Sequence, residues 1–128
     1  MRMFEQTVTT NRPFDEAVAA IEKTAAANGF RVLHVHDVAA TLAEKGFPRE
    51  PLKIIEICNA KYASEVLNRD VKISLMLPCT ISVYIEGGQT HISTLLPSSI
   101  ADFFPAAGIE QIAREVEKAV LQIVNEAR

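Results

Sequence analysis

The sequence contains no tryptophan and has few other aromatic residues, with six phenylalanines and two tyrosines among 128 residues. So few rings leave little material for stacking nucleic-acid bases or a planar cofactor. An excess of basic charge is also missing, because 13 lysines and arginines stand against 16 aspartates and glutamates, for a net charge of −3. Proteins that bind nucleic acid through its phosphates usually show the opposite balance. We therefore expect no nucleic-acid partner and no cofactor.

Only two cysteines are present, Cys58 and Cys79, whereas a secreted domain that depends on disulfides usually carries more. No apolar stretch approaches the roughly 18 residues of a membrane-spanning helix. Residues 1–10 lack the apolar segment of a signal peptide. We expect a cytoplasmic protein with reduced thiols and no membrane partner.

What is present is the composition of a globular protein, 48% hydrophobic and 23% charged. A chain of this length typically forms one domain, and we expect a single domain over residues 1–128. Such a domain can bury about two-thirds of its unfolded surface, so it needs neither a disulfide nor a metal for stability.

Hydrophobic periodicity predicts strands alternating with helices. The expected strands cover residues 2–9, 30–38, 52–58, 79–85 and 90–95. The expected helices cover residues 13–28, 38–45, 60–68 and 108–126. Residues 71–75 alternate as a strand would, with a helical turn as the alternative. Residues 47–51 form a loop, and residues 96–105 form a connection with a helical turn at 98–104.

Gly87-Gly88 joins two alternating runs and predicts a β-hairpin turn. The register places Tyr84 opposite His91 and Val83 opposite Ile92. One face of the hairpin is then apolar and the other mostly polar, as is common in antiparallel sheets. We predict an α+β, two-layer sandwich: an antiparallel sheet of about five strands with two long helices on one face. The polar face, with Tyr84 and His91, is the expected surface of a homodimer.

Cys58 ends the third expected strand and Cys79 begins the fourth, so antiparallel neighbours would bring the thiols together. That arrangement suits a redox pair, a soft-metal site or a sulfur acceptor, although two ligands alone rarely hold a metal. The alternative is that both cysteines are small core residues. Asn59 follows and either caps the next helix or belongs to a helix start that attracts an anion, and the two roles are compatible.

Glu56 lies between two isoleucines, where it is either a general base with a raised pKa or a residue of the exposed sheet face. His34 and His36 share one strand face. With His91 they would supply a three-histidine metal site, or else they belong to an open sheet face or a subunit contact. We favour the second interpretation and assign no metal.

The segment Leu52–Cys79, with its Cys58-Asn59 and Leu77-Pro78-Cys79 elements, resembles the family called domain of unknown function number 302. Phe14–Val38, including the Gly29-Phe30 junction, is similar to the N-terminal part of that family. The resemblance implies a small α+β domain with an antiparallel sheet, often a homodimer, and no established reaction. Ala60 stands where the family commonly has proline.

We therefore expect a homodimer that binds a small anionic or thiol-reactive ligand near Cys58, Asn59, Pro78 and Cys79. One alternative is a sulfur or redox enzyme, with Cys58, Cys79 or Glu56 as candidate catalytic residues. Another is a structural or interaction module whose cysteines are core residues. The sequence leaves open whether the protein is an enzyme.

Overall fold

A five-stranded antiparallel sheet organises the chain, in the spatial order β1-β5-β4-β3-β2. The computed structural model describes residues 3–128, so residue 2 of the first expected strand lies outside the described residues. The strands are β1 (Glu5–Thr10), β2 (Arg31–Asp37), β3 (Leu52–Cys58), β4 (Cys79–Glu86) and β5 (Gln89–Leu95). The edge strands are thus β1 and β2.

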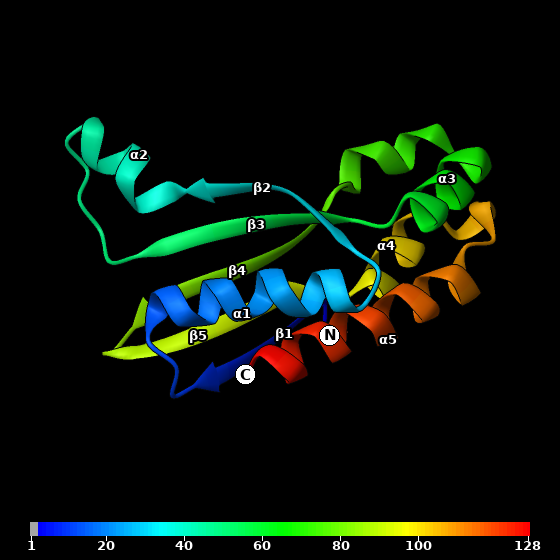
Figure 1. Ribbon diagram of the computed structural model, residues 1–128. Helices are drawn as coiled ribbons and strands as arrows, with labels where there is room; N and C mark the ends of the chain where they lie inside the picture. The colour runs from blue at the N-terminus through cyan, green and yellow to red at the C-terminus, as the bar shows by residue number, and fades with distance from the viewer. Residues whose placement is uncertain (1–2) are drawn as a thin grey trace.

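The long helices α1 (Phe14–Ala27) and α5 (Glu110–Ala127) lie side by side on one face of the sheet (Figure 1). The short helix α2 (Val38–Glu44) lies beyond one end of the sheet. Beyond the other end lie α3 (Ala60–Arg69), the 3-10 helix η1 (Val71–Met76), α4 (Pro97–Phe103) and the 3-10 turn η2 (Pro105–Ala107). The predicted two-layer α+β sandwich is confirmed.

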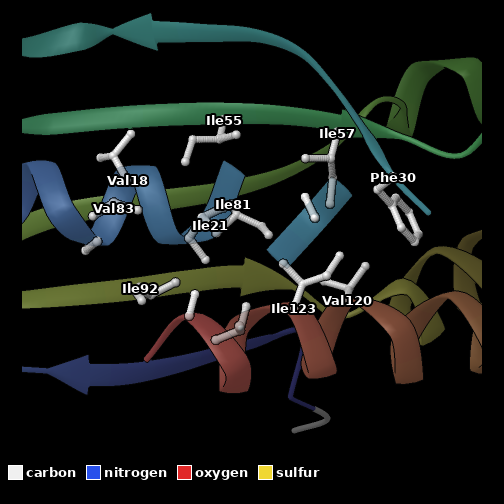
Figure 2. Packing of buried hydrophobic residues seen from close by; sticks show 14 of the residues in the cluster. Val18, Ile21, Phe30, Ile55, Ile57, Ile81, Val83, Ile92, Val120 and Ile123 are labelled. Carbon is white, nitrogen blue, oxygen red and sulfur yellow. The ribbon is translucent and has the colours of Figure 1, made fainter. Parts of the chain in front are cut away.

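The main core fills the space between the sheet and the two long helices (Figure 2). The period of each helix places one apolar stripe toward the sheet, such as Val18 and Ile21 on α1 and Val120 and Ile123 on α5. These stripes meet the inward side chains of the strands, including fully buried Ile55, Ile57, Ile81, Val83 and Ile92. Burial of each such side chain contributes about 1.5–3 kcal/mol.

The predicted hairpin register is correct: Tyr84 pairs with His91, Val83 with Ile92 and Glu86 with Gln89. Gly87 and Gly88 have φ angles of 62° and 76°, the left-handed conformation that a two-residue turn requires and that glycine adopts without steric cost. One sheet face therefore faces the core, and the opposite face carries Ser82, Tyr84, His91 and Ser93.

The two sheet edges are each modified. A β-bulge interrupts the pairing of β2 with β3 between Val32 and His34. At the other edge, the Arg128 side chain donates a hydrogen bond from Nε to the backbone carbonyl of Thr9 in β1, at 3.2 Å.

A second apolar cluster lies beyond the end of the sheet, where α3, η1, α4 and α5 meet, and its buried members are Val66, Ile73, Ile100, Ala101, Ile109 and Ala113. The segment that fitted either a strand or a helical turn is the helical η1, because Asp70 accepts a hydrogen bond from the Lys72 backbone amide and starts the turn. Ile73 is then 1% exposed, whereas Val71 and Leu75 are 71% and 82% exposed.

The short helix α4 has no capping side chain of its own. Instead, Glu117 of α5 accepts hydrogen bonds from the backbone amide of Ser98 at 3.1 Å and from the Ser98 hydroxyl at 2.6 Å. A carboxylate is favourable at this position because the N-terminus of a helix carries partial positive charge. Across residues 3–128, no helix combines the length and apolarity needed to cross a membrane.

Candidate functional site

A cavity of about 320 Å³ lies where the main core meets the second apolar cluster. Its walls come from the end of β3, the start of β4, and α3, η1, α4 and α5. Fourteen of its nineteen lining residues are apolar, and none of the nineteen, all within the described chain, carries a formal charge. The five with polar groups are Cys58, Asn59, Tyr62, Ser74 and Cys79.

The four residues predicted to bind a ligand, Cys58, Asn59, Pro78 and Cys79, all line this cavity. They come together because β3 and β4 are antiparallel neighbours, so the end of one strand and the beginning of the next lie at the same end of the sheet. The position of these residues is thus as the strand order suggested. Their role in binding stays a prediction.

The expected close pair of thiols does not form. The strand register places Cys79 opposite Ile57, so Cys58 is offset by one residue, and both cysteines are free. Burial raises the pKa of the Cys79 thiol from its ordinary value of 9.0 to about 11, and electrostatic repulsion from Cys58 adds to the effect. Cys79 is therefore protonated at neutral pH, which disfavours it as a nucleophile.

Asn59 is the N-cap of α3, as expected. Its side-chain oxygen accepts a hydrogen bond from the Tyr62 backbone amide at 3.1 Å. Its amide nitrogen donates to the Gly29 carbonyl at 3.0 Å. These two bonds hold the start of α3 against the junction between α1 and β2 and so fix one wall of the cavity.

Glu56 lies on the open face of the sheet, opposite the core-facing Ile55 and Ile57, and is not among the cavity-lining residues. Its carboxylate is 3.0 Å from His36 Nε2 on the neighbouring strand. The rings of His34 and His36 meet edge to face at 4.4 Å. Of the two interpretations of Glu56, the geometry fits a residue of the exposed face.

The three histidines do not meet. His34 and His36 are on β2 and His91 is on β5, with two strands between them, which corresponds to about 14 Å at the usual strand spacing. No cluster of three metal-ligating side chains was found among residues 3–128. His91 instead stacks on Tyr84, with ring centres 5.4 Å apart.

A chain of hydroxyl groups crosses the open face. Thr7 donates to the Glu5 carboxylate at 2.6 Å, which leaves the Thr7 oxygen to accept from Ser93 at 2.7 Å. Ser93 in turn accepts from the Tyr84 hydroxyl at 2.8 Å. The carboxylate thereby sets the direction of all three hydrogen bonds. The homodimer expected through Tyr84 and His91 on this face stays a prediction.

Sequence reasoning missed most of the cavity wall. Tyr62 and Ser74 were not singled out, and neither were the α4 and α5 residues Pro97, Ile100, Ile109, Ile112, Ala113 and Val116. The available signal was the apolar character of Ile100, in the expected helical turn at 98–104, and of Ile109, at the start of the expected helix 108–126, since both are buried.

The fold and the site together define a two-layer α+β protein with an uncharged apolar cavity at one end of its antiparallel sheet. The chain matches the domain of unknown function DUF302 over residues 6–127 and belongs to that family, as its cysteine motifs suggested. It is similar to the crystal structure of an uncharacterised conserved DUF302 protein from Bacillus stearothermophilus, with 30% identity. The TM-score is 0.94, over 99% of this chain and 100% of that one. No functionally curated protein matches the sequence.

Proposed function

We propose that the protein binds a small, uncharged, mainly apolar molecule in the cavity between α3, α4 and α5. The observation that carries the proposal is the lining: fourteen apolar residues of nineteen around about 320 Å³. Pockets for small molecules usually have volumes of about 300–1,000 Å³ and are lined mostly by apolar side chains with a few polar groups.

Of the two ligand types expected from the sequence, the anionic one has little support. A buried anion needs a charged partner or several hydrogen-bond donors to offset its lost hydration. None of the lining residues is charged, and the side-chain donors of the lining that are left unbonded, which are the Tyr62 and Ser74 hydroxyls and one N–H of the Asn59 amide, are neutral. A neutral ligand meets no such cost.

The alternative of a cysteine-dependent enzyme is weaker at Cys79. With a pKa of about 11, only about one Cys79 thiol in 10,000 is ionised at pH 7.

The two free thiols support a cytoplasmic location, because unpaired cysteines persist in reducing compartments.

The test is an NMR titration of isotope-labelled protein with naphthalene, a neutral probe of suitable size. Ala113, 5% exposed in the cavity wall, is replaced by leucine to fill the space. Ala19→Leu on the exposed side of α1 is the matched control. We expect saturable binding by the wild type and Ala19→Leu, and binding at least about tenfold weaker in Ala113→Leu, because the added carbons occupy the site. Absence of saturable binding by the wild type, or equal binding by Ala113→Leu, would support the structural-module alternative instead.

A further inference from the structure

The residues that α4 and α5 contribute to the cavity lining are all apolar, whereas the other side of the lining carries both apolar and polar side chains. The side chains with polar groups come from the end of β3, the start of β4, the first turns of α3, and η1. The opposite wall, from α4 and α5, is entirely apolar and includes Ile100, Ile109 and Val116. A ligand that matches both walls has a polar group at one end and a hydrocarbon body at the other.

Two hydroxyl groups of the lining are available to such a polar group. Within residues 3–128, neither the Tyr62 phenol nor the Ser74 hydroxyl has a hydrogen-bond partner, whereas the Asn59 amide already donates one hydrogen bond and accepts another. Tyr62 is half-buried, and its ring packs near that of buried Phe30, with centres 6.4 Å apart. Ser74 is exposed, so Tyr62 is the better-shielded hydrogen-bond partner.

The volume limits the size of the ligand. A dry protein cavity of about 150 Å³ holds one benzene molecule, and a water-sized group occupies about 30 Å³. By proportion, the cavity of about 320 Å³ accommodates about 10–13 non-hydrogen atoms.

We propose that the ligand is a neutral amphiphile of about 10–13 non-hydrogen atoms, of the class of medium-chain alcohols, aldehydes or esters. Its polar group hydrogen-bonds to the Tyr62 hydroxyl, and its hydrocarbon part lies against the α4–α5 wall. This inference rests on the proposed function and assigns to Tyr62 the role of a specificity-determining residue.

The first experiment compares head groups at one chain length, with 1-decanol and decanoate as probes at pH 8 and naphthalene as the purely apolar reference. We expect decanoate to bind at least about 100-fold more weakly than decanol, because no lining residue offsets the desolvation of its charge. Equal affinities would overturn the inference while naphthalene binding upholds the proposed function. If the wild type fails to bind naphthalene and decanol, the proposed function fails and this inference fails with it.

The second experiment removes one hydroxyl. Tyr62→Phe should weaken decanol binding about three- to tenfold, the worth of one hydrogen bond, and leave naphthalene binding unchanged. Tyr84→Phe, the same substitution on the open sheet face, is the matched control and should change neither. Unchanged decanol binding in Tyr62→Phe would overturn the assignment of Tyr62.

A length series measures the size limit. From 1-hexanol upward, affinity should rise about fourfold per methylene group, because each buries further apolar surface. The rise should stop between about 10 and 13 non-hydrogen atoms, where the cavity is full. A continued rise through 1-tetradecanol would refute a site of this size.

Discussion

The buried thiol of Cys79 makes the stability of the protein depend on pH in the alkaline range. Its pKa is about 11 in the folded protein, against an ordinary value of 9.0 that the unfolded chain should restore. Between these two values, the unfolded thiol is largely ionised while the folded thiol keeps its proton. The folded state then binds more protons, so the free energy of unfolding falls as the pH rises.

The magnitude follows from the two pKa values. The loss attributable to Cys79 is negligible below pH 8, about 1 kcal/mol at pH 9.5 and about 2 kcal/mol at pH 10.5, with a limit of about 3 kcal/mol. Lysines and tyrosines also titrate in this range. The informative quantity is therefore the difference in unfolding free energy between the wild type and Cys79→Ala, in which the other groups cancel.

This difference is measured by urea unfolding from pH 7.5 to pH 10.5 with a reductant present. Unfolding is monitored by circular dichroism, because the chain has no tryptophan to serve as a fluorescence probe. The stability advantage of the wild type over Cys79→Ala should be constant up to about pH 8 and then shrink as calculated. Cys58→Ala is the control and should retain most of the decline, since burial is the main cause of the shift. A difference that stays flat to pH 10.5 would refute the argument.

Three further predictions concern the supports of the cavity and the state of association. Asn59→Ala should lower the free energy of unfolding in urea by about 1–2 kcal/mol, because it removes the cap of α3 and the hydrogen bond to Gly29. Asn125→Ala, at an exposed position, is the control and should change stability little. Equal effects of the two substitutions would contradict the capping role. Glu117→Ala should lower the free energy of unfolding by about 1–3 kcal/mol, because the Ser98 amide and hydroxyl at the start of α4 lose their hydrogen-bond acceptor. Glu115→Ala, at an exposed position, is the control. Equal stability of the two variants would count against the interaction. Light scattering should give twice the 14.1 kDa of one chain if the expected homodimer exists, and a mass of one chain would rule it out.

Local patterns were sufficient to predict most of the fold. The period-two runs around Gly87-Gly88 determined the hairpin register, and the helical stripes determined which faces of α1 and α5 are buried. The segment after Asp70 was ambiguous because its short apolar run alternates like a strand but is also compatible with a helical turn. The structure resolves it through contacts of Ile73 with residues distant in the sequence.

The cavity could be predicted only in part, for a physical reason. Cys58, Asn59, Pro78 and Cys79 were located because strand order alone brings β3 and β4 to one end of the sheet. The opposite wall depends on how α4 and α5 pack against α3, and apolar residues that line a cavity have the same local pattern as residues that fill a core. The prediction that the two thiols form a close pair was wrong, because the sequence does not reveal that the strand register offsets Cys58 from Cys79 by one residue.

The bulge in β2 also affects how copies of the protein can associate. An unpaired sheet edge is a template for a strand from another molecule, and bulges that twist the edge away are a common protection against such growth. With β2 distorted between Val32 and His34, and the Thr9 carbonyl of β1 occupied by Arg128, neither edge presents a regular row of free backbone groups. Both features therefore disfavour extension of the sheet by a strand from another molecule.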